Sequence, residues 1–424
     1  KLINYPSTTI TASPVFADMS LSSVVLMTDG RLYTSGQAGI YATGQGPNSK
    51  FGVVGNVLAG DSGEEGTYLE DIINAAVTAD ERPGQSMYAI KSNGSVWAWG
   101  NNSYYKLGNG SNKDESTPVR VGASYLTMSQ YLYSLKVNGG SVTIPAPSVD
   151  SFNVFNSNNG GKTDAKLLWQ TYDGNNNIIT VNPDTGEITP VGVGTTYVIV
   201  SIANDPLTTG LVKVEVRPSD LTVGKTSVAY PQVAAGTDFT VALKADGTVW
   251  TWGENTYGEL GINDKTVTQS GAPVQVVLDN GSPLEDVIDI SANIYAAYAL
   301  TRDGSIYAWG RNYYAALGQG TGSDYYQYYP IKVKSTDGNG FFGAGLSNKA
   351  VKIRAGVHSA TVIMDDGTAY AWGYNNYGNL GTNGANNTLP NKIIGVNNAF
   401  DAEVGTYSTA ILNRDSTVFT VNAV

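Results

Sequence analysis

His358 is the only histidine of the chain, and the chain has no cysteine. A catalytic Ser-His-Asp triad would therefore have to use His358. A zinc site would need further nitrogen or sulfur ligands, which the sequence does not offer in a recognisable pattern. We interpret His358, in the segment AGVHSATVI, as a packing residue of a repeat. The sequence predicts a protein that is not an enzyme, with no catalytic residue, no metal and no cofactor.

Several carboxylates recur at turn positions, where they favour a turn rather than catalysis. Aspartate tolerates positive φ and accepts hydrogen bonds from its own backbone. The aspartates at these turns are Asp29, Asp246, Asp303, Asp366 and Asp415. A glycosidase would need two carboxylates placed across a groove, and this pattern reveals no such pair. The segments Asp337-Gly-Asn339-Gly and Asp173-Gly-Asn175 resemble parts of calcium loops, but neither completes a ligand set.

Tyrosines form the most distinctive clusters, and they favour binding surfaces because the ring is rigid and amphipathic. They gather in RNYYAALG and in SDYYQYYP, and the Gly-rich segment DGNGFFGAG adds two phenylalanines. The candidate binding residues are Tyr313, Tyr314, Tyr325, Tyr326, Tyr328, Tyr329, Phe341 and Phe342. The alternative is that these aromatics cover a larger repeat unit. Four tyrosines at equivalent loop positions are either scaffold or a shared rim: Tyr104, Tyr257, Tyr314 and Tyr377.

The four equivalent loop tyrosines lie in a repeated hairpin whose clearest copy is ALKADGTVWTWGENTYGELG, residues 242–261. Asp-Gly between alternating apolar runs predicts a type I′ turn, which needs positive φ at both central residues. The phrase recurs at 89–108, 299–318 and 362–381. We expect its tryptophans to pack between sheets, namely Trp99, Trp252, Trp309 and Trp372. We expect its asparagines to organise the exit loops, namely Asn102, Asn255, Asn312 and Asn375.

Aligned on the turn, the sequence contains seven copies of this unit. The last copy stops at TVFTVNAV, residues 417–424, and the chain begins with TTITASPV, residues 8–15, which resembles the missing outer part. A repeat divided between the two ends is what closure of a β-propeller requires, and closure removes exposed sheet edges. We therefore expect residues 8–15 to complete the last blade. A linear β-solenoid is the alternative.

One segment interrupts the repeat. After Asn138-Gly139 the Trp-Gly strand does not follow, and residues 141–218 show short alternating strands separated by turn signals. This pattern of short strands and turns predicts a small β-sandwich with Trp169 in its core. The expected organisation is a first propeller part at 1–140, an inserted sandwich at 141–218 and a second propeller part at 219–424.

In these motifs the chain resembles the RCC1 repeat family, whose repeats carry an Asp-Gly turn, an aromatic-x-Trp-Gly strand and an Asn-x-x-Gly-x-Leu-Gly exit. The resemblance covers about residues 1–140 and 219–424 and implies an all-β, seven-bladed β-propeller. It also implies a packing role for His358, which stands where the repeat usually has histidine. The first copy lacks the Trp before Gly36, and the seventh turn is Asp415-Ser416. The inserted segment resembles bacterial Ig-like modules of the BIG2 type through Trp169 and its TGEIT and VGTT motifs.

The charge balance limits the class of partner. The formal net charge is -11, so the basic surface that binds nucleic acid or an anionic membrane is not expected. No run of about 18 apolar residues suggests a membrane span. A Cys-free chain rich in Gly, Asn and Thr is compatible with export, and we expect an extracellular protein, secreted or on a bacterial cell surface. The sequence starts at Lys1, and we expect any signal peptide or anchor to lie outside it.

The family resemblance implies a rigid ring that presents loops to another macromolecule, and it does not by itself give a function. The sequence predicts a non-enzymatic binding or display protein that recognises a protein or glycan on a cell surface, or neighbouring subunits of an assembly. One alternative is a structural or receptor-binding protein of a phage virion. Another is a secreted inhibitor resembling the β-lactamase inhibitors of this family.

Overall fold

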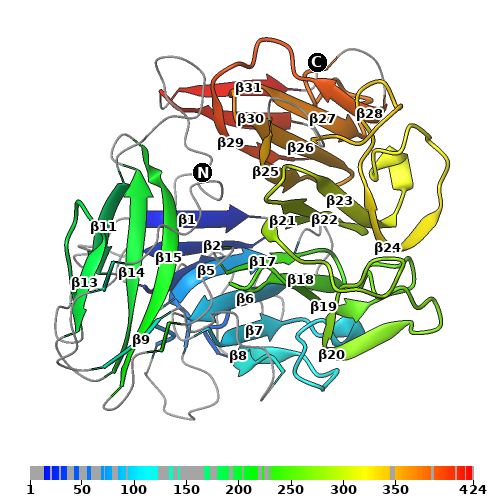
Figure 1. The fold of residues 1–424 in the computed structure, drawn as a ribbon. Coiled ribbons are helices and arrows are strands. Elements are labelled where there is room, and N and C mark those ends of the chain that lie inside the picture. Colours follow the sequence, from blue (N-terminus) through cyan, green and yellow to red (C-terminus); the bar gives the residue numbers. More distant parts are fainter. Residues whose placement is uncertain are drawn as a thin grey trace.

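The computed structural model places antiparallel four-stranded sheets around a common centre, with the first strand of each sheet innermost (Figure 1). It describes residues 14–19, 22–27, 30–35, 43–46, 55–58, 68–70, 72–78, 85–91, 94–122, 133–136, 142–143, 167–171, 179–190, 194–202, 205–217, 222–223, 229, 231–343, 349–382, 386–405, 408–415 and 417–422. Within these residues no helix is long and apolar enough to cross a membrane.

Six sheets of the described residues form propeller blades, and each is named here by its strands. The first two are β1 (Pro14–Met19), β2 (Ser23–Met27), β3 (Leu32–Ser35) and β4 (Gly55–Asn56), then β5 (Ile72–Val77), β6 (Ser86–Lys91), β7 (Val96–Gly100) and β8 (Glu115–Arg120). The next two are β17 (Gln232–Ala235), β18 (Phe239–Leu243), β19 (Val249–Glu254) and β20 (Gln269–Gln275), then β21 (Val287–Ala292), β22 (Ala296–Thr301), β23 (Ile306–Arg311) and β24 (Tyr326–Lys332). The last two are β25 (Ala350–Ala355), β26 (Ser359–Met364), β27 (Ala369–Gly373) and β28 (Asn387–Lys392), then β29 (Ala399–Val404), β30 (Ser408–Asn413) and β31 (Val418–Asn422).

The all-β propeller expected from the repeats is confirmed, but six blades are described where the sequence predicts seven. The third copy supplies strand β9 (Tyr133–Lys136), and β9 pairs with β15 (Asp205–Arg217) and β16 (Thr222–Val223) instead of forming a propeller sheet. The reason is local, because this copy lacks the Trp-Gly strand that would pair with β9 in a blade. Innermost strand β5 therefore contacts β17 directly.

Two small sheets lie between the β5–β8 and β17–β20 blades in sequence, and they stand to one side of the propeller in Figure 1. One has the order β11-β14-β15-β9-β16 and the other β10-β13-β12. Their remaining strands are β10 (Val142–Thr143), β11 (Leu167–Thr171), β12 (Ile179–Val181), β13 (Glu187–Pro190) and β14 (Gly194–Ile202). Trp169 is buried and packs against Gly186 in the turn between β12 and β13. The Ig-like identity of these sheets stays a prediction.

The prediction that the first residues close the last blade is tested only in part. Residues 8–13 lie outside the described residues, whereas Pro14 belongs to β1 and pairs with Met27 of β2 in the first blade. The last sheet is described as three strands, β29-β30-β31.

The hairpin turns differ from the predicted type I′ geometry. Of the two central turn residues of the clearest copy, only Gly247 has positive φ, and Asp246 does not. The amide of Lys244 donates to the carbonyl of Thr248, and the amide of Gly247 donates back to the carbonyl of Lys244. Asp246 instead uses its carboxylate, which accepts from the amide of Thr248 at 3.0 Å. The Asp-Gly pair therefore makes a longer turn closed by its own side chain.

A charged network links the innermost strands of the last three blades. Arg354 of β25 contacts Asp289 of β21 at 3.0 Å and Asp401 of β29 at 2.9 Å. Although burial opposes ionisation, the charges of Arg354 and Lys352 hold the pKa of Asp401 at about 2. Asp289 also accepts the amide of Ile353 at 3.0 Å. The inner strands are thus joined by side chains as well as by packing.

Candidate functional site

The exit loops after each Trp-Gly strand lie at one end of the blades, and an asparagine organises each loop. In the β21–β24 blade, Asn312 is buried and its side-chain oxygen accepts from the amide of Leu317 at 3.0 Å. Its side-chain nitrogen donates to the carbonyl oxygens of Thr321 and Ser323. Asn102, Asn255 and Asn375 make the equivalent bond to the leucine amide five residues on. This confirms the predicted loop-organising role.

A second contact joins neighbouring blades at three junctions, through Trp252, Trp309 and Trp372. The indole nitrogen of Trp309 donates to the backbone oxygen of Glu259 at 2.9 Å, and that of Trp372 donates to Ala316 at 2.8 Å. The four repeated tryptophans are fully buried. They pack between sheets as the repeat pattern predicts. We call this tryptophan-to-carbonyl contact the interblade latch.

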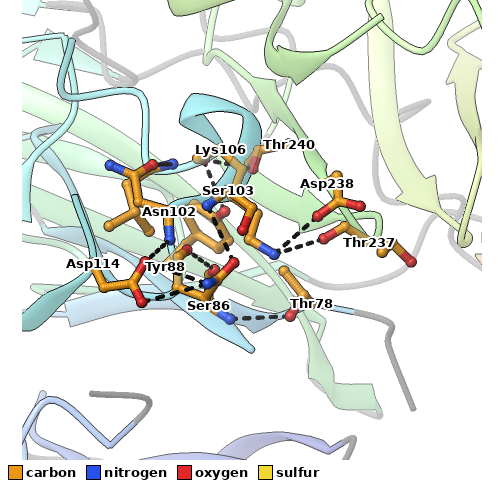
Figure 2. Close-up of polar contacts among 12 residues, drawn as sticks. Thr78, Ser86, Tyr88, Asn102, Ser103, Lys106, Asp114, Thr237, Asp238 and Thr240 are labelled. Carbon is orange, nitrogen blue, oxygen red and sulfur yellow. Dashed lines mark hydrogen bonds and ion pairs between the residues drawn. The ribbon is translucent and has the colours of Figure 1, made fainter. Parts of the chain in front are cut away.

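The latch between the β5–β8 and β17–β20 blades carries an additional ion pair, shown in Figure 2. The Lys106 side chain is only 2% exposed, and its ammonium lies 3.2 Å from Asp238. The same ammonium donates to the carbonyl of Thr237 at 3.0 Å. In the next blade the equivalent residue is Glu259, whose carboxylate accepts from the amide of Tyr257 at 2.8 Å. Burial raises the pKa of Glu259 to about 8.

The loops of three blades bring one continuous aromatic surface together at this end. Tyr257 packs against Tyr326 and Tyr295 at centroid distances of 4.9 and 5.4 Å. Farther along, Tyr314 packs against Tyr313 at 4.1 Å and Tyr374 at 4.8 Å. We define the aromatic band as Tyr257, Tyr295, Arg311, Tyr313, Tyr314, Tyr326, His358, Tyr374 and Tyr377.

Arg311 lies in one half of the band, surrounded by rings. Its guanidinium carbon is 4.6 Å from the Tyr313 ring centroid and 4.8 Å from that of Tyr257. The rings of Tyr295 and Tyr326 complete the group at 5.5 and 6.0 Å. Two guanidinium nitrogens of Arg311 donate to Asp324, the shorter bond at 2.6 Å. These hydrogen bonds raise the pKa of Arg311 above its ordinary value.

His358 lies in the other half of the band. Its ring centroid is 5.2 Å from both Tyr313 and Tyr314. Tyr295 stacks with it at 6.4 Å, and Tyr374 meets it edge-on at 6.4 Å. The packing role predicted for His358 is therefore what the geometry shows, and its packing partners are band residues.

The band is built largely from residues that do not recur in other blades. At the position of Tyr295 and His358, the earlier blades have Gln85 and Asp238. At the position of Arg311, they have Asn101 and Glu254. Residues common to every blade build the scaffold, whereas residues found in one region can serve a particular partner. The sequence does carry a signal for Tyr295, Arg311 and Tyr374, because each differs from the residue at the same position in the earlier copies.

The structure brings together only some of the sequence-predicted binding residues. Tyr313, Tyr314 and Tyr326 belong to the band, and the hydroxyl of Tyr328 donates to the carbonyl of Thr256 at 3.0 Å next to it. Tyr325 is partly buried and packs against the core between the β21–β24 and β25–β28 blades. Tyr329 is half-buried on β24.

Phe341 and Phe342 lie at the opposite end of the blade. Arg311 pairs with Tyr326 across the sheet, but Phe341 bridges to Lys334, beyond the far end of β24. Phe342 is 2% exposed and packs on Tyr370, so its ring belongs to the core. Phe341 is 51% exposed. The two phenylalanines therefore cannot share a contact surface with the band.

Comparison with known proteins matches the repeated part of the chain. Two models described as regulator of chromosome condensation (RCC1) repeat match it, one at residues 93–129, 246–293, 303–363 and 366–412 and the other at residues 232–259 and 287–315. These matches include the aromatic band.

Curated relatives share part of the chain. The E3 ubiquitin-protein ligase HERC2 of Homo sapiens is 32% identical over 142 residues, which is 34% of this chain and 3% of that protein. The ultraviolet-B receptor UVR8 of Arabidopsis thaliana is 28% identical over 195 residues, 45% of this chain and 41% of that protein. The secretion-regulating guanine nucleotide exchange factor of Bos taurus is 32% identical over 170 residues, 39% and 34% of the two chains. The chain thus spans less than half the length of each.

Two solved structures share the fold. Human WBSCR16 aligns with a TM-score of 0.54 at 15% identity, covering 93% of this chain and 70% of that one. Yeast RCC1 (Prp20), solved with Kap60 bound, aligns with a TM-score of 0.55 at 14% identity, covering 95% and 68%. At such low identity the similarity shows the fold alone.

Proposed function

Because the chain is an RCC1-repeat β-propeller with an aromatic band across three blades, we propose that it is a non-enzymatic binding protein whose partner docks on that band. The observation that carries this proposal is the exposure of the band's two flanks. Tyr326 and Tyr377, at opposite ends of the band, are each 46% exposed, while the rings between them are half-buried. Rigid tyrosines that are already packed lose little conformational entropy on binding.

The chemistry of the band supports a contact surface rather than a reaction site. Its imidazole, on His358, is enclosed by four tyrosine rings. The carboxylate at the Arg311 half of the band, on Asp324, accepts hydrogen bonds from two nitrogens of Arg311. The imidazole and the carboxylate thus both contribute to the packing of the rings.

We place the partner outside a bacterial cell, as a surface protein or glycan or as a neighbouring subunit of an assembly. The composition supports this location, since the chain has no cysteine, 50 glycines and 27 tyrosines and a net charge of -11. Immunogold electron microscopy on the producing culture tests it. Label on the cell wall supports surface display, label on filaments or virions indicates a particle subunit, and label confined to the cell interior refutes the location.

The binding role is tested with labelled protein on arrayed glycans and on intact cells. The double variant Tyr326→Ala/Tyr377→Ala should lose the signal, because it removes both exposed flanks of the band. The matched control is Phe341→Ala, which removes a similarly exposed aromatic at the opposite end of the blade. Equal signal from the double variant and the wild type would remove the band from the binding site.

One relative is named a guanine nucleotide exchange factor, so exchange activity is a second reading of the fold. A nucleotide-release assay on a panel of small GTPases separates it from the proposal. Release accelerated by this chain would replace passive binding with exchange as its function.

A further inference from the structure

The aromatic band already holds one guanidinium. Arg311 lies within 4.6–6.0 Å of four tyrosine ring centroids and donates to Asp324 through two nitrogens. Ring faces attract cations, and arginine suits this arrangement because its plane stacks on rings while its edge binds a carboxylate. The surface therefore has the elements of a guanidinium-binding site, and the chain's own Arg311 already occupies part of it.

The same elements remain accessible from outside. The Arg311 side chain is 20% exposed, but that of Asp324 is 39% exposed and Tyr326 is 46% exposed. Arg311 occupies the inner side of this group, and an aromatic ring and a carboxylate edge stay open to solvent. The charge of Arg311 is balanced by Asp324 at 2.6 Å, which lessens its repulsion of a second cation.

The surrounding charge favours the same class of partner. Asp264, half-buried on the exit loop of the neighbouring blade, is an anion at neutral pH, and its hydrogen bonds with Thr266 lower its pKa further. Glu254 stands in that blade at the position of Arg311. The whole chain carries a net charge of -11, which steers cationic partners towards it and repels anionic ones.

We propose that the partner is a protein segment bearing arginine side chains, which stack on Tyr326 and Tyr257 and bind the open edge of Asp324. This inference rests on the proposed binding function and adds the chemistry of the partner. Lysine fits less well, because its compact ammonium is strongly hydrated and cannot stack.

The test uses an oligoarginine peptide and an oligolysine peptide of equal length, titrated into the full chain by calorimetry. The proposal expects tighter binding of oligoarginine. Tyr326→Ala should weaken that binding by about 2- to 30-fold, the range of one cation–π contact. Asp324→Asn should weaken it as well, and Phe341→Ala should leave it unchanged. Because Tyr326 is on the surface, thermal melting of its variant should stay near that of the wild type.

Three results would overturn the inference. They are equal affinity for the two peptides, equal loss with Phe341→Ala, and an unchanged affinity in Tyr326→Ala. Each would mean that the acidic chain attracts any cationic peptide without the band.

If the glycan or cell signal depends on Tyr326 and Tyr377 while oligoarginine binding does not, the partner is not cationic and the band remains a binding site. If neither depends on the band, the proposed function also fails.

Discussion

The indole nitrogen of Trp252 donates a 2.7 Å hydrogen bond to the backbone oxygen of Lys106, a residue 146 positions earlier. The interblade latch thus joins the β5–β8 blade to the β17–β20 blade, across the chain segment that separates them in sequence. One core cluster contains Tyr88 and Ile73 from the first of these blades and Val233 and Trp252 from the second. The propeller is therefore continuous at this point without the intervening sheets.

Removal of the intervening segment should leave the propeller folded. Replacing residues 123–228 by a flexible Gly/Ser linker keeps both sides of the latch and of the core cluster. We expect one cooperative melting transition by calorimetry, with far-UV circular dichroism retaining a β-sheet spectrum. As a comparison, Trp252→Phe in the full chain removes the latch bond and part of a fully buried ring, so it should lower the melting temperature, although the Lys106 oxygen still accepts from the hydroxyl of Tyr88 at 2.9 Å. A deletion variant that fails to fold would show that the segment is part of the propeller.

The ion pair at the same latch should contribute to stability through burial. Lys106→Met leaves the carboxylate of Asp238 without the ammonium at 3.2 Å, in a site where the lysine was 2% exposed. We expect a loss of about 3 kcal/mol in urea unfolding, the typical cost of leaving a buried charge without its partner. Lys106→Met/Asp238→Asn should recover part of that loss, because the stranded charge is gone. Additive effects in this double-mutant cycle would contradict the coupling.

The repeated parts of this structure could be predicted from the sequence because their signals are local. Trp252 and Asn255 recur with a turn at fixed spacing, and the structure buries both as expected. The pairing of β9 with β15 could not be predicted, because it joins residues about 80 positions apart that carry no repeat signal. The missing Trp-Gly strand after Asn138-Gly139 indicated only that the repeat fails there.

The candidate site was predicted in part, for a similar reason. Tyr313, Tyr314 and Tyr326 stood out as a cluster in the sequence, and the structure keeps them together. Phe341 was grouped with them by proximity along the chain, but antiparallel pairing carries it to the other end of the blade. Arg311 was missed because its ring partners come from separate segments that only the propeller brings together.

Stability should fall with rising pH through Glu259. Burial raises the pKa of Glu259 in the folded chain to about 8, from an ordinary value of 4.5. Between these values the unfolded chain has released a proton that the folded chain keeps, so raising the pH favours unfolding. The contribution reaches about 1.4 kcal/mol per pH unit and levels off above the folded pKa.

The variant Glu259→Gln isolates this contribution. Glutamine stays neutral, and its side-chain oxygen can still accept from the amide of Tyr257, as the carboxyl oxygen of Glu259 does at 2.8 Å. Urea unfolding at a series of pH values measures the free energy of unfolding of both proteins. This free energy should depend less on pH in the variant. Between pH 5 and 8 the difference between the two proteins should change by about 1.4 kcal/mol per pH unit. Parallel curves for the two proteins would show that Glu259 is ionised when folded.

Two equivalent loop positions should respond oppositely to the same methyl group. Gly378 has φ 69° and Ala315 has φ 66°, each three residues after the loop asparagine. A side chain in this left-handed region costs about 1–2 kcal/mol. Gly378→Ala should therefore destabilise the chain by about that amount, although no atom lies within 4 Å of the added carbon. Ala315→Gly should be neutral or stabilising, because the relieved strain offsets the lost buried methyl. Calorimetric melting of both variants measures this, and a loss above about 1 kcal/mol in Ala315→Gly would show that the loop holds alanine there without strain.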